Sequence, residues 1–255
     1  MDAVILAAGS GSRLGVDAPK CLVEVGGRTL LHRQVEALTR AGVENIIVVV
    51  GYRHEEIRSA APERVRFIYN EQFAVTNSMY SFHLARSVIR GDVVVLNSDV
   101  LFPFELLERV LDGGGSALAM DSASGADPEH MKVHLRGDRL VLMSKQLSPR
   151  FTHGENVGLL LLKAAAAQAS LAAAGALLRR GHQRGWLAQA ISTIARTHRI
   201  CAVDIAGLPW VEIDYPEDLV VAREVVGPAI TRLNAARPAV AARRADHEDK
   251  TAVAG

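Results

Sequence analysis

The sequence is short of the features that mark secreted, zinc-stabilised and membrane proteins. It has two cysteines, Cys21 and Cys201, among 255 residues. Two distant thiols cannot build a disulfide framework, and they lack the paired spacing of a zinc site. No apolar run is long enough to cross a bilayer, and the first residues lack the charged and apolar regions of a secretory signal. These absences predict a cytoplasmic protein without a membrane segment.

An excess of charge of one sign is missing as well. The chain has 29 basic and 28 acidic residues, a formal net charge of +1, so nothing favours binding to nucleic acid. Aromatic residues make up only 5% of the chain. The hydrophobic content of 49% is, by contrast, ordinary for a globular protein, and the length suits one large α/β domain with a substantial core.

What the chain does have is concentrated in its first thirty residues. An apolar run at Ala3–Ala7 is followed by a turn of small residues that ends at Gly15. Such a run, bounded by glycine, predicts a buried strand. Glycines allow positive φ and the close approach of a ligand, and successive N–H groups in such a turn form a concavity that binds anions. Because Arg13 and Lys20 add positive charge, the stretch predicts a polyphosphate site.

Two familiar phosphate loops do not fit this stretch. A Walker loop needs Gly-Lys-Ser/Thr, whereas Lys20 follows a proline well beyond Gly15. A Rossmann fingerprint needs a third glycine that is missing after Gly9 and Gly11. The stretch LAAGSGSRLG followed by PKCLVEVGGRTLL instead resembles the nucleotidyltransferase family. The resemblance implies an enzyme that transfers a nucleoside monophosphate from an NTP to a phosphorylated small molecule; the alternative is an ordinary glycine-rich turn with two surface cations.

The rest of the chain alternates predicted strands and helices. Apolar runs at 45–51, 65–70 and 92–102 predict buried strands, and helical spacing predicts helices at 30–42 and from residue 52. This alternation indicates a doubly wound sheet, in which ligands bind at the carboxyl ends of the strands. Together with the resemblance, it predicts an α/β, Rossmann-like three-layer α/β/α nucleotidyltransferase (GT-A-like) fold with a mostly parallel mixed central sheet.

The expected domain covers residues 1–228. Within it, residues at about 121–160 resemble the acceptor-side insertion of the family, which carries a similar "MKV … SK" pattern. From residue 229 to 255 the sequence turns to alanine, arginine, proline and charge without apolar periodicity. This composition predicts a flexible C-terminal tail.

Two aspartates lie where metal ligands are expected. Asp99 follows a buried strand, and Asp214 lies in WVEIDYPEDL, just before a helix that starts at Pro216. Carboxylates at the end of a buried strand suit Mg²⁺, which prefers one or two of them together with substrate phosphates. The alternative for Asp99 is a cap for the helix that starts near Pro103. The resemblance implies that Asp99 and Asp214 both bind Mg²⁺, the one cofactor expected.

A second stretch of the sequence indicates a particular branch of the nucleotidyltransferase family. Residues 70–85, which end in TNSMYSFHLA, resemble the choline-phosphate and phosphonate cytidylyltransferase branch. The resemblance implies CTP and a small acceptor of the phosphocholine, 2-aminoethylphosphonate or hydroxyalkylphosphonate type, with release of pyrophosphate. A quaternary ammonium acceptor needs an aromatic cage. The residues that could supply such a cage are Tyr80, Phe82, Trp186, Trp210 and Tyr215.

The resemblance also implies roles for particular residues. Arg13 and Lys20 are the catalytic candidates, facing the leaving pyrophosphate and the α-phosphate. The nucleotide-binding candidates are Leu6, Ala7, Ala8, Gly9, Ser10, Gly11, Ser12, Asn77 and Ser98. The acceptor-binding candidates are Ser81, Tyr80, Lys145, Glu155, Trp210 and Glu212. Which of Glu129, Glu155 and Glu212 contacts the substrate is left open.

Two other functions fit the same fold. One is a sugar-1-phosphate nucleotidylyltransferase that uses UTP or dTTP, and the other is a non-catalytic, nucleotide-sensing regulatory subunit. A regulatory subunit would have lost catalytic residues, whereas Arg13, Lys20, Asp99 and Asp214 are all present. Besides CTP and the acceptor, we expect neither nucleic acid nor a membrane as a partner. The oligomeric state, a homodimer included, is left open.

Overall fold

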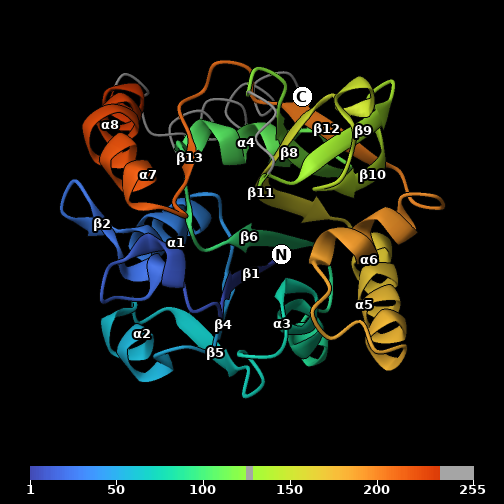
Figure 1. Ribbon diagram of the computed structural model, residues 1–255, viewed down its shortest axis with the longest axis horizontal. Coiled ribbons are helices and arrows are strands. Elements are labelled where there is room, and N and C mark those ends of the chain that lie inside the picture. Colours follow the sequence, from blue (N-terminus) through green and yellow to red (C-terminus); the bar gives the residue numbers. More distant parts are fainter. Residues whose placement is uncertain (125–128, 236–255) are drawn as a thin grey trace, which may run out of the picture.

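A nine-stranded sheet runs through the middle of the molecule, in the order β5-β4-β1-β6-β11-β8-β12-β10-β9 (Figure 1). The computed structural model describes residues 1–124 and 129–235. The first half of the sheet is parallel, with β1 (Asp2–Ala7) between β4 (Asn45–Val50) and β6 (Val93–Asn97), and β5 (Val65–Tyr69) outside β4. Parallel strands end at the same edge, so the glycine-rich turn after β1 and the end of β6 lie side by side.

The second half of the sheet is largely antiparallel. Strand β11 (Gly154–Leu162) runs antiparallel to β6 and to β8 (Ser116–Asp121), and β12 (Ile200–Asp204) pairs parallel to β8. Strand β10 (Arg139–Ser144) is antiparallel to β12 and to β9 (Lys132–Arg136). The expected mixed α/β sheet is confirmed, with parallel pairing dominant in the first half and antiparallel pairing in the second.

Helices cover both faces of this sheet. Alternate residues of a strand point to opposite faces, so Ile5 packs in one apolar cluster while Val4 packs in the other. On the Ile5 face lie α1 (Leu30–Arg40), α2 (His54–Ala60) and α4 (Phe104–Asp112). On the Val4 face lie α3 (Ser78–Leu84), α5 (Ala164–Arg179) and α6 (Leu187–Ile194). The three-layer α/β/α architecture is therefore confirmed.

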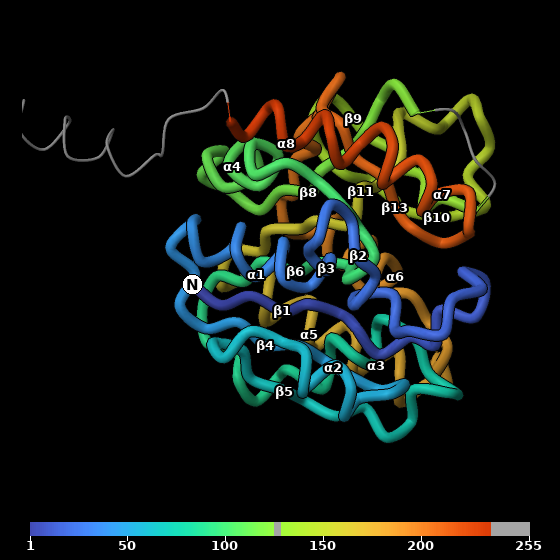
Figure 2. The backbone as a smooth tube through the Cα atoms, turned by 90° about the vertical axis from the view of Figure 1, so that its left-hand side faces the viewer, coloured from blue at the N-terminus to red at the C-terminus, as the bar shows by residue number. Residues whose placement is uncertain are grey.

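The C-terminal helices pack beside a small hairpin. Helix α7 (Pro216–Val221), a π-helical turn (Ala222–Val226) and α8 (Gly227–Ala235) form one continuous segment. In Figures 1 and 2 this segment lies near the hairpin of β2 (Glu24–Val25) and β3 (Arg28–Thr29). Val25 of the hairpin shares a third apolar cluster with Leu219, Val226 and Ile230. Because Ile230 is buried there, the tail predicted from residue 229 begins inside a packed helix. Residues 229–235 thus belong to the folded part, and 236–255 lie outside the described residues.

Two short strands bring distant segments to the same edge of the sheet. Strand β7 (Val100–Leu101) follows β6 after two residues and pairs antiparallel with β13 (Val211–Glu212). Within the described ranges, no helix combines the length and hydropathy needed to cross a bilayer.

Gly51, directly after β4, packs closely against the backbone of the glycine-rich turn. A Cβ placed on Gly51 would lie 2.5 Å from Cβ of Phe73 and 2.6 Å from the carbonyl oxygen of Ala8. We expect Gly51→Ala to destabilise the fold by about 1–3 kcal/mol, because packed backbone has to move. Urea unfolding checks this against the control Gly91→Ala, whose Cβ would have no described atom within 4 Å. Equal unfolding midpoints for the two variants would contradict the prediction.

Candidate active site

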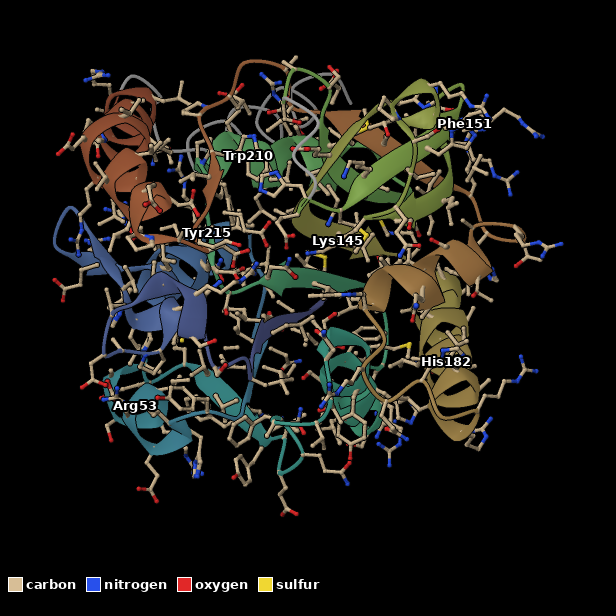
Figure 3. The ribbon with its side chains drawn as sticks, in the orientation of Figure 1. Arg53, Lys145, Phe151, His182, Trp210 and Tyr215 are labelled. Carbon is tan, nitrogen blue, oxygen red and sulfur yellow. The ribbon has the colours of Figure 1, made fainter. Side chains whose placement is uncertain are left out.

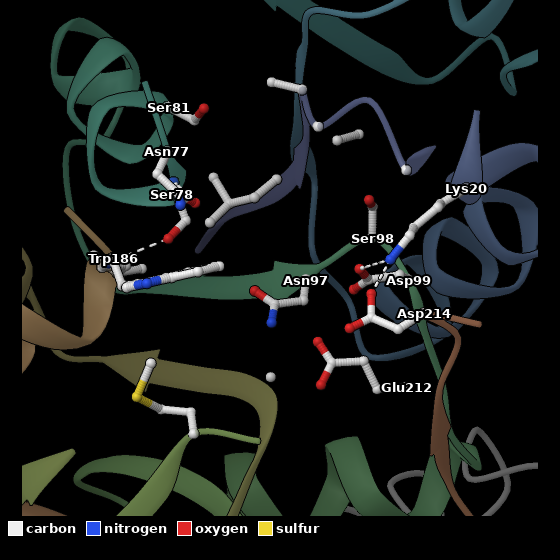
Figure 4. Close-up of a pocket in the computed structure, with 18 of the residues that line it drawn as sticks. Lys20, Asn77, Ser78, Ser81, Asn97, Ser98, Asp99, Trp186, Glu212 and Asp214 are labelled. Carbon is white, nitrogen blue, oxygen red and sulfur yellow. Dashed lines mark hydrogen bonds and ion pairs between the residues drawn. The ribbon is translucent and has the colours of Figure 1, made fainter. Parts of the chain in front are cut away.

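A cavity of about 610 Å³ opens at the carboxyl ends of β1 and β6. This is the edge at which ligands bind in open α/β sheets. The predicted site residues that line it are Leu6, Ala7, Ala8, Gly9, Ser10, Gly11, Ser12, Arg13, Lys20, Asn77, Ser81, Ser98, Asp99, Lys145, Glu212 and Asp214. The fold thus gathers most of the residues singled out from the sequence into one cavity, shown in Figure 4.

Three predicted acceptor residues do not line this cavity. Tyr80 packs against the core, because its neighbour Ser81 takes the cavity side of α3. The carboxylate of Glu155 is buried and hydrogen-bonded to Nδ1 of His130 at 2.8 Å. Trp210 donates from Nε1 to Asp121 at 2.7 Å and lies away from Lys145 in Figure 3. The structure therefore does not bring these three side chains to the site.

Gly11 lets Lys20 reach into the cavity. Its φ of +61° lies in the left-handed region that favours glycine. A Cβ at Gly11 would lie 2.6 Å from Cγ of Lys20, so a side chain there would block the lysine stem. Lys20 begins a short 3₁₀ turn, Lys20–Leu22, directly after Pro19. The glycine-rich turn and the lysine are thus parts of one packed unit.

The ammonium of Lys20 lies between two carboxylates. It forms an ion pair with Oδ1 of Asp214 and lies 3.4 Å from Oδ2 of Asp99 (Figure 4). Arg13 holds the other oxygen of Asp214 at 2.7 Å and reaches Oε2 of Glu129 at 3.3 Å. The side chains of Lys20 and Asp214 are 13% and 15% exposed, which shields their charges from water. Basic and acidic side chains therefore alternate in a chain of ion pairs beside the glycine-rich turn.

Pairing of β7 with β13 sets the spacing of the two aspartates. Asp99 lies in the connection between β6 and β7, and Asp214 follows β13. The backbone N–H of Ile213 donates to the carbonyl of Asp99 at 2.9 Å. Asp218, in the first turn of α7, accepts from the backbone N–H of Asp214 at 2.9 Å. Asp218 thus fixes the backbone that carries Asp214 as well as capping the helix.

The crowding of carboxylates shifts their pKa values in different directions. Burial and the nearby Asp99 and Asp214 raise the pKa of Glu212 to about 8. Burial also raises the pKa of Asp99, although Lys20 opposes this effect. Burial would raise the pKa of Asp214 too, but Lys20 and Arg13 outweigh it and lower that pKa. Asp214 is therefore the carboxylate most strongly held in its charged form.

The same carboxylates fit a hard divalent cation. Asp99 and Asp214 already converge on one positive charge, and carboxylate oxygens are the ligands that Mg²⁺ prefers. In the part of the chain that the structure describes, no group of three or more His, Cys, Asp or Glu side chains forms a complete metal site. A site of two carboxylates completed by substrate phosphates is the arrangement typical of Mg²⁺.

Several cavity residues were not singled out from the sequence. Asn97 lies between the carboxylates and Trp186 in Figure 4. Gly158 makes room for it with φ +83°, since a Cβ there would be 2.9 Å from Nδ2 of Asn97. The signal for Asn97 was its place at the end of a buried strand, next to Ser98. Glu129, which the sequence left open, lines the cavity and contacts Arg13.

One aromatic side chain defines the wall opposite the carboxylates. Trp186 lines the cavity, and Nζ of Lys145 lies 4.8 Å from the centre of its ring. Lys145 also lies 3.8 Å from Glu129. Of the five aromatic residues considered for a cage, Trp186 is the one that lines the described cavity. Trp186 thus gives the site an aromatic wall with a lysine on it, and Phe73 is a further aromatic residue of the lining.

A glycine-rich turn, an arginine, a lysine and two aspartates at one edge of an α/β sheet define a nucleotidyltransferase. More narrowly, the chain belongs to the family of MobA-like NTP transferase domains, whose model matches residues 3–194.

Curated relatives support this family, and a solved structure shares the fold. The chain is 33% identical over 231 residues to a bifunctional IPC transferase and DIPP synthase of Rubrobacter xylanophilus, covering 88% of this chain and 51% of that protein. It is 32% identical over 235 residues to a CMP-5'-(3-aminopropyl)phosphonate synthase of Streptomyces rubellomurinus, covering 85% and 37%. The chain thus spans about half or less of these relatives. The inositol-1-phosphate CTP transferase of T. maritima shares the fold, with a TM-score of 0.72 and 21% identity over 93% of this chain and 97% of that one.

The thiol of Cys21 lines the cavity, yet it is not built to react. Cys21 is 2% exposed, and burial raises its pKa to about 12, so at pH 8 it stays a neutral thiol. We expect a thiol reagent at pH 8 to modify Cys201 in the native protein and Cys21 only after unfolding. Peptide mass mapping of the two sites checks this. Fast native labelling at Cys21 would contradict the assigned burial.

Proposed function

We propose that the chain is a CTP-dependent cytidylyltransferase that transfers CMP to a small phosphorylated or phosphonate acceptor and releases pyrophosphate. The observation that carries the proposal is the convergence of Lys20, Asp99 and Asp214 beside the glycine-rich turn. The choice of CTP and of a phosphonate rests on the resemblance of residues 70–85 and on the relative named as a CMP-phosphonate synthase.

The reaction is an in-line displacement at the α-phosphorus. An acceptor oxygen forms a bond to that phosphorus, and the bond to the bridging oxygen of the β-phosphate breaks, so that pyrophosphate leaves with the electron pair. No covalent enzyme intermediate is needed, and the protein contributes by positioning and by stabilising charge. The glycine-rich turn holds the β- and γ-phosphates in this scheme. Arg13 faces the leaving pyrophosphate, and Lys20 neutralises charge at the α-phosphate.

Asp99 and Asp214 hold Mg²⁺ in this proposal. When bound, the ion supplies charge neutralisation and orientation of phosphate oxygens. The pairing of β7 with β13 and the hydrogen bond to Asp218 fix the backbone segments that carry the two aspartates, so the carboxylates lie near each other before any ligand binds. Lys20 exchanges part of its contact with these carboxylates for contact with the phosphate.

The acceptor lies against Lys145, Ser81 and Glu212 in this proposal. Trp186 gives the acceptor one aromatic wall, and the lysine on its face leaves no empty cage for a quaternary ammonium group. A quaternary ammonium group has no N–H and depends on such a cage, whereas an amino or hydroxyl group can donate to the carboxylates of Glu129 and Glu212, so the site favours an aminoalkyl- or hydroxyalkylphosphonate over phosphocholine. A cavity of about 610 Å³ has to hold CTP as well, which limits the acceptor to a small molecule.

Lys20→Ala tests the mechanism. Removing one preorganised donor to the transition state should lower kcat by roughly 10²–10³. The matched control is Lys163→Ala, because Lys163 pairs with Asp92 outside the cavity. Steady-state pyrophosphate release measures both variants. A Lys20→Ala enzyme as fast as the control would contradict the role given to Lys20.

A screen of nucleotides and acceptors tests the substrates. We expect Mg²⁺-dependent pyrophosphate release from CTP with 2-aminoethyl- or hydroxyalkylphosphonate, and less with phosphocholine. ATP, GTP, UTP and dTTP serve as matched nucleotides, and sugar 1-phosphates as matched acceptors. Release from UTP or dTTP with sugar phosphates would replace the proposed substrates with those of a sugar nucleotidylyltransferase. No release in any well, with CTP still bound, would favour the regulatory alternative.

A further inference from the structure

Gln34 lies outside the cavity lining and belongs to no motif of the sequence. It is in the middle of α1, 2% exposed, on the face that packs against the sheet. A buried amide on a helix face that otherwise carries Leu31, Val35 and Leu38 needs a physical reason, because polar groups are costly to bury.

The amide nitrogen of Gln34 bridges the two ends of the turn that carries Asp99. Nε2 donates to the carbonyl of Asn97 at 2.9 Å and to the carbonyl of Val100 at 2.9 Å. A primary amide has two N–H donors, so both are used here. These two carbonyls belong to the residues on either side of Ser98–Asp99, where β6 ends and β7 begins. One nitrogen atom therefore sets the width of the turn.

The oxygen of the same amide indicates that the NH₂ group is the part of Gln34 that matters. Oε1 of Gln34 is buried and has no hydrogen-bond partner among the described residues. An apolar side chain of equal length would avoid that unpaired oxygen, but it would leave the carbonyls of Asn97 and Val100 without this donor. The amide is thus retained for what it donates.

The turn held by Gln34 also determines where Asp214 lies. Val100 is opposite Glu212 in the β7–β13 pair, and Ile213 donates to the carbonyl of Asp99 at 2.9 Å. A shift of the turn would move the backbone of both aspartates together. The hydrogen bond from Gln34 to Val100 therefore helps to fix the backbone of both Asp99 and Asp214.

We propose that Gln34 is a positioning residue, whose amide NH₂ fixes the Ser98–Asp99 turn and, through the β7–β13 pair, aligns Asp99 and Asp214 for the metal and the triphosphate. The inference rests on the proposed function for the identity of the metal and the triphosphate. The hydrogen bonds of Gln34 to Asn97 and Val100 do not depend on that function. Partners that orient metal ligands from outside the coordination sphere commonly change metal affinity or activity by about 10–100-fold when they are removed.

The test compares Gln34→Met with Ser170→Ala. Methionine keeps the length of the side chain and removes both donors. Ser170 is also fully buried on a helix and donates to a backbone carbonyl, that of Ala166, but it lies outside the cavity lining. Thermal unfolding verifies that both variants fold. If Gln34→Met does not fold, Gln34→Asn replaces it, because the shorter amide cannot reach both carbonyls.

Two readouts that do not need turnover decide the inference. Hydrogen exchange of the backbone N–H groups of residues 98–101, followed by mass spectrometry, should be roughly tenfold faster in Gln34→Met than in Ser170→Ala, because loss of the two hydrogen bonds to the carbonyls of Asn97 and Val100 makes local opening of the turn easier. The affinity of the CTP complex for Mn²⁺, measured by electron paramagnetic resonance, should fall by about 10–100-fold, with CTP affinity in the absence of metal nearly unchanged.

Exchange at 98–101 that matches the control would overturn the inference, and so would faster exchange with unchanged Mn²⁺ affinity. A wild-type protein that binds neither CTP nor Mn²⁺ would overturn the proposed function instead. In that case the exchange rates alone would still show whether Gln34 holds the turn, so the two failures are distinguishable.

Discussion

The site depends on a lysine ammonium that lies between two aspartates. Carboxylates as close as Asp99 and Asp214 repel each other, and in a partly buried position this repulsion is poorly screened. Lys20 relieves it by contacting both, while Arg13 takes the second oxygen of Asp214. The two cations, Lys20 and Arg13, thus neutralise the two carboxylates within one cluster of ion pairs. In the proposed function, a triphosphate with its metal brings charges of both signs, so that it exchanges ion-pair partners with this cluster and leaves no buried charge unpaired.

The surrounding fold serves this arrangement. Gly11 clears the path of the lysine stem, and parallel pairing brings the ends of β1 and β6 to the same edge. The short β7–β13 pair then joins segments more than a hundred residues apart in the chain, and Asp218 and Gln34 each hold one of them. Rigid support of this kind is what a reaction driven by positioning requires. We propose that the opposite wall, with Trp186 and Lys145, distinguishes the acceptor.

The sequence predicted the elements with strong local signals. Apolar runs and helical spacing located β1, β4, β6 and the layered α/β/α architecture, which is confirmed, and the resemblance placed Lys20, Asp99 and Asp214, which the structure brings together. Local signals could not tell that Tyr80 faces the core while Ser81 faces the cavity, because one residue along a helix changes the face. Nor could they show that Glu155 pairs with His130, or that Gln34 reaches the turn after β6, since both contacts depend on tertiary packing.

A crystal structure with Mn²⁺ and a non-hydrolysable CTP analogue shows directly whether Asp99 and Asp214 bind the metal beside the triphosphate, because the anomalous signal locates the Mn²⁺. We expect a Mn²⁺ peak bound by oxygens of Asp99 and Asp214, triphosphate on the glycine-rich turn, and the ammonium of Lys20 moved towards the α-phosphate. A nucleotide bound elsewhere, or Lys20 still paired with both aspartates and no metal beside them, would contradict this expectation.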